Sequence, residues 1–279
     1  REAGREMSTL SVVTIVSQAV ALKYPIIRVL ESVLPTADEI VVNVDLGRPD
    51  GTSEMLRAWE ENLEKPYLLK PPVILMGVPW NWEARDAGQE LARQTNLAFE
   101  ACTKDWILYL QADEAVHEDD HEDIRWLLDL PAEFTGAQFM RLYFFGSPKV
   151  LRKDWTQPLV RMFRRGRARS VGDAMNCEAD GLVWPHSDGT PRLFHYSRVA
   201  DPGVIGQRIR NLDGLFHPEE NLAPARLYDF GLRAFDTHAT TEHPAAVDPS
   251  VLERFEGTHP APMRRWLAEY GHQSTEERK

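Results

Sequence analysis

The chain has 279 residues, 43% hydrophobic and 27% charged, which are the proportions of an ordinary globular protein with a sizeable core. Its 43 acidic residues outnumber its 32 Lys and Arg residues, and a formal charge of -11 argues against a general nucleic-acid-binding protein. The two cysteines form no disulfide framework or zinc pattern, no apolar run reaches the ~20 residues of a membrane span, and residues 1–6 lack the apolar core of a signal peptide. We therefore expect a cytoplasmic protein with no nucleic-acid partner and no membrane span.

The N-terminal part alternates expected strands and helices. Leu10–Val16 is β-branched and uncharged, as in a buried strand, and Pro25 suits the first turn of the helix that follows. Pro49-Asp50-Gly51 is a turn signal, after which Thr52 or Ser53 can cap a helix. Such alternation predicts a mainly parallel sheet. The expected strands cover residues 10–16, 39–44 and 71–76, and the expected helices cover 24–34 and 52–59.

The remainder of the chain has a less regular pattern. Residues 170–182 are polar, contain glycines and indicate little regular structure, and the character of the chain changes after Asp201-Pro202. We predict a catalytic domain over residues 7–200 and a smaller helical C-terminal cap over 201–279. Further helices are expected at residues 83–102, 121–130, 204–216 and 261–270, and further strands at 106–110, 137–145, 159–163 and 192–196.

The strand predicted at residues 106–110 leads into the main candidate site. Trp106 to Leu110 is an unbroken apolar run, and Asp113-Glu114 follows it directly. In an open α/β sheet, ligands bind beyond the carboxyl ends of the strands, so both carboxylates are expected at a crevice. Carboxylate oxygens there suit Mg²⁺ or Mn²⁺ bound to a diphosphate. The alternative is a solvated acidic loop, because residues 118–123 are also rich in acids.

Three segments in the same order resemble the family-2 glycosyltransferases. Residues 42–52 resemble the family's Asp-Asp-Gly-Ser, any residue, Asp-Gly-Thr motif, with Leu46 and Arg48 as departures. Residues 91–96 resemble its Ala-Arg-Asn, any residue, Gly segment. Residues 111–114 resemble its Asp, any residue, Asp, Asp or Glu motif, with Gln111 in the place of the first Asp. The order and spacings agree over roughly residues 10 to 115. Weaker likeness continues at residues 172–173, 194–196 and 259–260.

The resemblance implies an α/β protein of the GT-A fold, with a mainly parallel mixed sheet flanked by helices. It implies transfer of a sugar from a UDP-, GDP- or dTDP-linked donor to an acceptor hydroxyl that the sequence does not identify, with inversion and with Mn²⁺ or Mg²⁺. The donor-binding residues would be Asp45, Arg85, Gln111, Ala112 and Asp113, the metal ligands Asp113 and His195, and the catalytic base Asp173.

Most of these residues also have a purely structural interpretation. Asp45, expected to accept a hydrogen bond from the nucleobase, could satisfy its own turn. Arg85 or Arg93 would meet the diphosphate, with a helix-surface charge as the alternative, favoured for Arg93. A lone histidine such as His195 is commonly structural, although neutral imidazole ligates metals. Asp173, with Glu178 and Asp180 as further candidates for the base, could simply occupy a Gly-flanked turn.

Other residues offer acceptor-side candidates. The basic run at residues 164–169 is interpreted either as a solvated turn or as a surface that attracts an anionic acceptor. Trp155 and Trp184 are candidate platforms for a sugar ring, or they close the core. His117 and His121 are interpreted as surface residues.

Three other functions compete with glycosyl transfer. A degenerate sugar-nucleotide-binding or partner-binding module is supported by Gln111, which replaces a carboxylate by a neutral amide. A nucleotidyltransferase would need a Gly-rich loop after the first strand, where residues 17–20 contain no glycine. A metal-dependent hydrolase would rest only on the acidic cluster.

Overall fold

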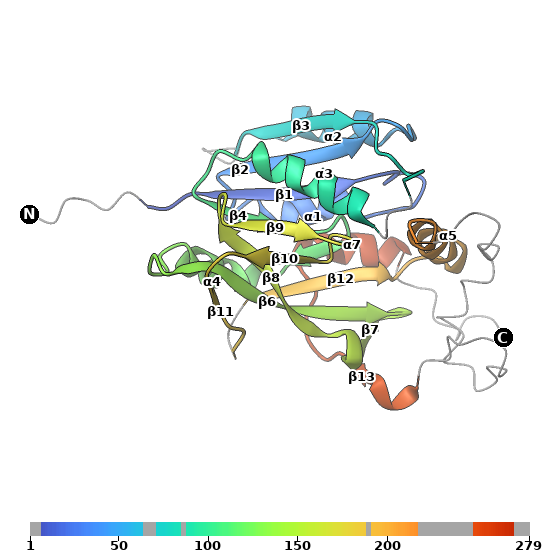
Figure 1. Ribbon diagram of the computed structural model, residues 1–279. Helices are drawn as coiled ribbons and strands as arrows, with labels where there is room; N and C mark the ends of the chain where they lie inside the picture. Colours follow the sequence, from blue (N-terminus) through green and yellow to red (C-terminus); the bar gives the residue numbers. More distant parts are fainter. Residues whose placement is uncertain (1–6, 64–70, 85–87, 188–190, 217–247, 271–279) are drawn as a thin grey trace, which may run out of the picture.

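The computed structural model describes residues 7–63, 71–84, 88–187, 191–216 and 248–270 (Figure 1). The helices are α1 (Ile26–Val33), α2 (Thr52–Asn62), α3 (Gln89–Glu100), α4 (His121–Leu127), α5 (Pro202–Asp213) and α7 (Ala261–Tyr270). The strands are β1 (Leu10–Val16), β2 (Glu39–Asp45), β3 (Val73–Val78), β4 (Trp106–Tyr109), β5 (Glu114–Val116), β6 (Phe134–Phe145), β7 (Ser147–Arg152), β8 (Gln157–Arg164), β9 (Ala168–Val171), β10 (Asn176–Ala179), β11 (Leu182–Trp184), β12 (Arg192–Arg198) and β13 (Leu252–Arg254).

The strands form one large mixed sheet in the order β13-β7-β6-β8-β4-β1-β2-β3, with β12 and β11 beside β6 and β5 beside β12. The strands β4, β1, β2 and β3 are parallel, whereas β4 and β8, β8 and β6, β6 and β7, and β7 and β13 pair antiparallel. A separate two-stranded ribbon pairs β9 with β10. The predicted α/β class with a mixed sheet flanked by helices is confirmed.

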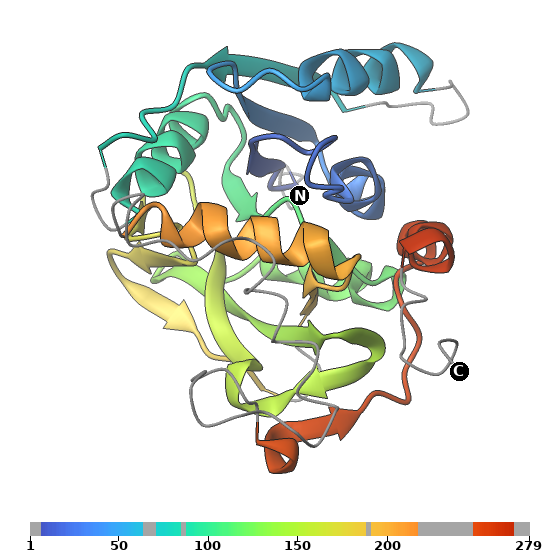
Figure 2. The same cartoon turned by 90° about the vertical axis from the view of Figure 1, so that its right-hand side faces the viewer.

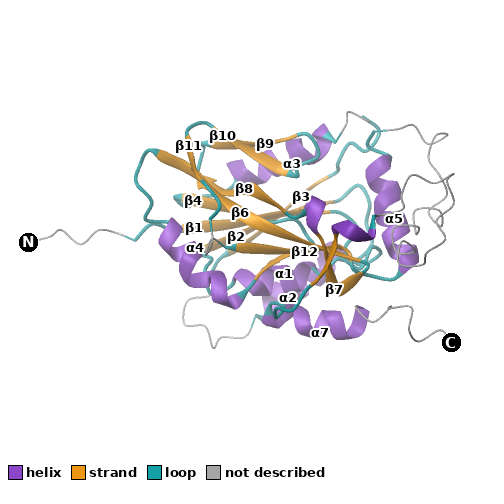
Figure 3. Cartoon of the chain, turned by 90° about the horizontal axis from the view of Figure 1, so that it is seen from below, coloured by secondary structure: helices purple, strands orange, loops and turns teal. Residues whose placement is uncertain are grey.

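Helices cover both faces of the parallel strands. In β1, Leu10, Val12 and Val16 belong to the same buried cluster as the apolar side of α1, while Val13 and Ile15 belong to the cluster beneath α3. Figure 3 shows α1, α2 and α7 on one side of the sheet and α3 on the other. Because successive side chains of a strand point to opposite faces, a strand covered on both sides must be apolar throughout. This explains the continuous apolar runs of the sequence.

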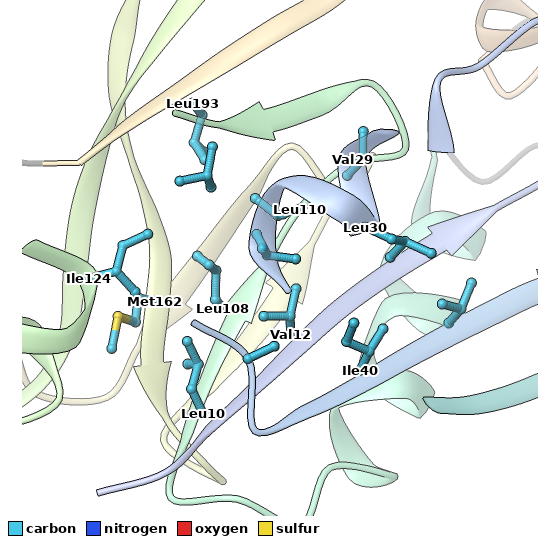
Figure 4. Packing of buried hydrophobic residues seen from close by; sticks show 14 of the residues in the cluster. Leu10, Val12, Val29, Leu30, Ile40, Leu108, Leu110, Ile124, Met162 and Leu193 are labelled. Atoms are coloured by element: carbon cyan, nitrogen blue, oxygen red, sulfur yellow. The ribbon is translucent and has the colours of Figure 1, made fainter. Parts of the chain in front are cut away.

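The core beneath α1 fixes the strand that carries the candidate site. Leu108 and Leu110 are fully buried and pack beside Val12 of β1 and Leu30 of α1 (Figure 4). Each such side chain contributes about 1.5–3 kcal/mol through burial. The residues that follow β4 are therefore presented from a rigid base.

Three local expectations were wrong. Residues 170–182 contain β10 and the ends of β9 and β11, which are too short and too polar to show a periodic pattern. The helix expected from residue 83 begins at Gln89, after Gly88 in the left-handed region (φ +83°). The helix α2 follows Gly51, also left-handed, so Thr52 is its first residue and not a side-chain cap.

The C-terminal elements pack against the rest of the sheet. The helix α5 lies beyond the carboxyl ends of the parallel strands (Figure 1) and runs across the middle of the view in Figure 2, below β2 and β3. The strand β13 adds to the sheet through β7, and α7 contacts α1. None of the helices in the described ranges is both long and apolar enough to cross a membrane.

Candidate functional site

A cavity of about 530 Å³ lies where β1 and β4 end, with α5 along one side. Of the predicted site residues, Gln111, Ala112, Asp113, Asp173 and His195 line it. Asp45 does not line the cavity but accepts hydrogen bonds from three residues that do. Arg85 lies outside the described residues. The cavity is also lined by Ser17, Gln18, Tyr24, Arg48, Trp80, Trp82, Leu91, Arg141, Tyr143, Asp154, Trp155, Gln157, Arg198, Arg208 and apolar residues of α5.

The turn after β4 separates the two adjacent carboxylates. The Gln111 backbone N–H donates to Glu114 Oε2 (2.9 Å) and the Glu114 N–H donates to the Gln111 carbonyl (3.0 Å), which closes the turn. Asp113 is 7% exposed and lines the cavity. Glu114 is fully buried and points into the protein. The expectation that both carboxylates reach the crevice was therefore wrong for Glu114.

Arg161 explains why Glu114 can be buried as an anion. Its Nη2 donates to Glu114 Oε1 over 2.8 Å, and both side chains are completely enclosed. Burial raises the pKa of Glu114, but the charge of Arg161, with smaller contributions from the neighbouring His195 and the Gln111 N–H, outweighs this effect and lowers the pKa to about 2. Glu114 thus braces the turn that holds Gln111 and Asp113. Arg161, on β8, was not identified from the sequence, although an arginine inside a buried strand indicates a buried ion pair.

His195 and Asp113 face each other in the cavity wall. His195 is 5% exposed, its Nε2 pairs with Ser197 Oγ (2.9 Å), and its ring stacks on Tyr143 with centroids 4.8 Å apart. Its Nδ1 makes no hydrogen bond among the described residues and lies 3.3 Å from Glu114 Oε1 and 3.7 Å from Asp113 Oδ1.

These two side chains fit a shared divalent cation. Their separation of 3.7 Å is shorter than two metal–ligand bonds of about 2.1 Å each. No group of three or more His, Cys, Asp or Glu side chains suited to a metal occurs in the described part of the chain. The protein would therefore supply two ligands, and a diphosphate and water would supply the rest, as is usual for Mg²⁺.

Asp45 is buried at the end of β2 and accepts four hydrogen bonds. Its Oδ1 accepts from the backbone N–H groups of Gly47 (2.8 Å) and Trp80 (3.1 Å). Its Oδ2 accepts from Ser17 Oγ (2.8 Å) and Trp82 Nε1 (2.7 Å). A carboxylate offers about four acceptor positions, so all of those on Asp45 are occupied. Asp45 thus ties the loop after β3 to the ends of β1 and β2.

The loop after β3 places two indole rings in the cavity wall. The rings of Trp80 and Trp82 stack with centroids 5.6 Å apart, and the guanidinium carbon of Arg48 lies 4.1 Å from the Trp82 ring. The Asn81 N–H donates to Glu90 Oε1 on α3 (2.8 Å), which holds the loop from the other side. This end of the cavity therefore presents aromatic surface and one cation.

Asp173 reaches the cavity from the turn between β9 and β10. Its neighbours Gly172 (φ +59°) and Ala174 (φ +60°) are both left-handed, and its Oδ1 accepts from the Met175 N–H (3.2 Å). Glu178 and Asp180 pair instead with Arg169 and Arg167 at the surface. The structure thus places only the first of the three candidate bases at the cavity.

The basic run at residues 164–169 does not face the cavity. Arg164 donates to the carbonyls of Phe134 and Leu130, and Arg165 donates to the carbonyl of Lys104. Arg167 and Arg169 form the surface ion pairs just described. The structure therefore gives the run a structural role away from the cavity, and its attraction of an anionic acceptor stays an untested prediction.

A second wall of the cavity, away from Trp80 and Trp82, comes from β6 and the segment before β8. Of its residues, only Trp155 was predicted from the sequence. Tyr143 is at its centre and contacts His195, Trp155 (ring centroids 4.9 Å apart) and Ser197 (Oγ to Tyr143 OH, 2.9 Å). Arg141 is 5% exposed, and burial lowers its pKa. Trp184 does not line the cavity and packs against Trp126 and Phe134.

Arg208 fastens α5 over the cavity. Its guanidinium donates to the carbonyls of Leu22 (2.9 Å), Lys23 (2.8 Å) and Ser197 (3.1 Å). It also lies 4.2 Å from the ring of Tyr24, whose pKa is raised to about 12 by burial. The helix is thereby joined to the segment after β1 and to the end of β12.

Comparison with known proteins gives matches to solved structures only, since no protein-family profile and no curated protein matches the chain. Residues 1–349 of TarS from S. aureus share 13% identity over 80% of this chain and 69% of that chain, with a TM-score of 0.41. The same TarS segment in complex with UDP shares 14% identity over 81% of this chain and 70% of that chain, with a TM-score of 0.41. A mannosyltransferase from Pyrobaculum calidifontis in complex with GDP-Man and Mn²⁺ shares 12% identity over 82% of this chain and 70% of that chain, with a TM-score of 0.43.

Proposed function

We propose that this protein is a glycosyltransferase that moves a sugar from a nucleotide-sugar donor to an acceptor hydroxyl. One observation carries the proposal: the three segments that resemble the family-2 glycosyltransferases meet at one cavity. Arg48 comes from the first segment, Leu91 from the second, and Gln111 to Asp113 from the third. Their position beyond the carboxyl ends of parallel strands is where open α/β sheets bind ligands.

In this proposal Asp113 and His195 hold Mn²⁺ or Mg²⁺ against the donor diphosphate. When bound, the cation would neutralise charge on the departing nucleoside diphosphate. Gln111 and Ala112 contact the donor beside it, and Glu114 and Arg161 keep that turn in place. Asp45 shapes the nucleotide end by fixing the loop that carries Trp80 and Trp82.

Asp173 is proposed as the general base. Its carboxylate would take the proton of the acceptor hydroxyl as that oxygen forms a bond to the anomeric carbon. The bond between the anomeric carbon and the diphosphate oxygen breaks in the same step, and the electron pair leaves with the nucleoside diphosphate. Attack from the face opposite the leaving group inverts the anomeric configuration.

Calorimetric titration of UDP, GDP and dTDP, each with Mn²⁺ and then with EDTA, tests the donor site. We expect one nucleotide to bind in a metal-dependent manner, and Asp113→Ala to weaken it at least ~tenfold, because a ligand of a cation that bridges to the diphosphate is lost. Glu178→Ala, which removes a carboxylate outside the cavity, is the matched control. If no nucleotide binds to the wild-type protein, the proposal is wrong.

A second candidate is a module that binds a sugar nucleotide without turnover. Gln111 favours it, because a neutral amide stands where the resemblance implies a carboxylate. Donor consumption distinguishes the two candidates. Nucleotide binding without release of nucleoside diphosphate from any UDP-, GDP- or dTDP-sugar, with water or an acceptor present, would favour the module.

A further inference from the structure

The cavity wall carries more positive charge than the proposed nucleotide-sugar donor and its divalent cation require. Four arginines line it (Arg48, Arg141, Arg198 and Arg208), although the chain as a whole has a charge of -11. Three carboxylates also line it, but Asp154 accepts hydrogen bonds from Nε (2.9 Å) and Nη2 (3.0 Å) of Arg152, which neutralises its charge. Asp113 and Asp173 are therefore outnumbered. A donor diphosphate and the divalent cation proposed with it largely neutralise each other, so together they leave this excess in place.

Arg141 shows the excess most clearly. It is 5% exposed, its Nη2 donates to the Trp155 carbonyl (3.1 Å), and its Nε has no hydrogen-bond partner among the described residues. No carboxylate forms an ion pair with it in the described ranges. Glu114 and Asp113 act on Arg141 only from a distance, so its guanidinium is buried with an open N–H and without a direct ion pair, which is costly and which a bound anion would relieve.

Arg198 contacts the same tyrosine, Tyr143. Its Nε donates to the Tyr143 hydroxyl (3.2 Å), while the guanidinium carbon of Arg141 lies 5.4 Å from the Tyr143 ring centroid. Arg198 is half-buried and, like Arg141, has no ion-pair partner among the described residues. The two guanidinium groups thus lie beside one tyrosine in the cavity wall.

The strand order separates Arg141 from the nucleotide end, and Arg198 ends β12, which pairs with the same strand β6. The segments at the ends of β1, β2 and β3 lie on one side of β4, and Arg141 on β6 lies on the other, beyond β8. Asp113 follows β4, between the two sides. A donor whose diphosphate is at Asp113 and whose base is near Trp82 would leave the Arg141 side for the acceptor.

We propose that the acceptor is anionic, and that a carboxylate or phosphate group on it binds between Arg141 and Arg198 beside Tyr143. This inference rests on the proposed function, since it assigns the second substrate of the same cavity. Both guanidinium groups offer the charge-assisted hydrogen bonds that carboxylates and phosphates accept.

Paired small ligands test the inference. Glucuronate is titrated against glucose, and glycerol phosphate against glycerol, each with and without the nucleotide that binds best and Mn²⁺. We expect at least one anionic ligand to bind ~tenfold or more tightly than its neutral counterpart, because charge-assisted hydrogen bonds replace neutral ones. The pair that shows the preference identifies the group as a carboxylate or a phosphate.

Variants decide which residues cause the preference. Arg141→Gln and Arg198→Gln should each reduce it at least ~fivefold and change the nucleotide affinity by less than ~twofold. Arg198 is half-exposed, so its variant still tests the site if Arg141→Gln fails to fold. Arg167→Gln, which removes a surface arginine outside the cavity, should behave like the wild-type protein.

Two results would overturn the inference. Equal binding of anionic and neutral ligands would show that the wall does not select an anion. A loss of nucleotide affinity in both variants as large as the loss of anion affinity would assign the arginines to the donor diphosphate. Failure of the proposed function is seen separately, as absence of nucleotide binding to the wild-type protein.

Discussion

The hydrogen bonds of Asp45 limit how a nucleobase can reach it. Both of its oxygens already accept hydrogen bonds. One of these bonds comes from Nε1 of Trp82, whose indole ring lines the cavity. A base that donates to Asp45 must first displace one of these four donors. Trp82 is the best placed to be displaced, because its ring is only partly buried and lies in the wall beside Arg48 and Trp80.

Trp82→Phe should therefore tighten nucleotide binding by up to about tenfold, since the ring is kept and the competing N–H is removed. The free protein should lose about 1–3 kcal/mol of unfolding free energy, because a buried carboxylate oxygen loses a donor. Calorimetric titration and denaturant unfolding measure the two effects. Trp80→Phe is the matched control, since the buried Trp80 Nε1 has no partner among the described residues. Weaker nucleotide binding in Trp82→Phe alone would show that the indole N–H serves the nucleotide directly.

The turn between β9 and β10 depends on its contact with the start of α3. A Cβ added to Gly88 would lie 2.8 Å from both Cα and Cβ of Asp173, so only a glycine lets the helix start approach so closely. Gly88 is also left-handed (φ +83°), which favours glycine in its own right. The position of the proposed base thus depends on an element far from it in sequence.

Gly88→Ala should displace the turn that carries Asp173. We expect a loss of about 2–4 kcal/mol in unfolding free energy, from backbone strain and from the steric clash, and a loss of donor turnover larger than the loss of nucleotide affinity. Gly166→Ala separates the two causes, because Gly166 is equally left-handed (φ +76°) but has no atom within 4 Å of an added Cβ. Similar losses in the two variants, measured by denaturant unfolding and donor consumption, would argue against the contact.

The elements that the sequence predicted well are those whose pattern is local. The strand at Leu10–Val16 and the helix at Ala261–Tyr270 were predicted at their exact bounds, because a continuous apolar run and an amphipathic helical pattern are both visible in the local sequence. Asp113 was placed at the strand end for the same reason. The short polar strands of the β9–β10 ribbon have no such pattern.

The contacts that complete the site join residues far apart in the chain, so a local pattern could not reveal them. Glu114 looks like a second cavity carboxylate until Arg161, 47 residues later, is placed beside it. The saturation of Asp45 depends on Trp82, 37 residues away. Arg141 and Tyr143 lie in a strand that was predicted from its β-prone residues, but only the folded structure shows that they line the cavity.

The last part of the chain is held to the sheet by an aromatic cluster around His259. Its Nδ1 pairs with the Tyr196 hydroxyl (2.9 Å), and its ring lies near those of Phe144 (4.9 Å between centroids) and Phe255 (5.2 Å). Met263, Trp266 and Leu267 of α7 belong to the same buried cluster as Tyr196. Protonation of His259 would place a positive charge among these rings, so the cluster favours the neutral imidazole.

Burial lowers the pKa of His259 from 6.5 to about 4 in the folded protein. Between these values the unfolded chain binds the proton and the folded chain does not, so His259 contributes stability above pH 6.5 that is lost as the pH falls toward 4. We expect this contribution to be about 1 kcal/mol, or about 2–4 °C in melting temperature. The value is small because the ring is partly open to solvent, which screens its charge.

His259→Asn should be less stable at neutral pH, and its melting temperature should fall less steeply between pH 6.5 and 4 than that of the wild-type protein. Parallel melting curves at each pH make the comparison, because the other titrating groups contribute equally to both proteins. Identical slopes would mean that the cluster accepts the imidazolium, and that the C-terminal segment does not depend on the charge of His259.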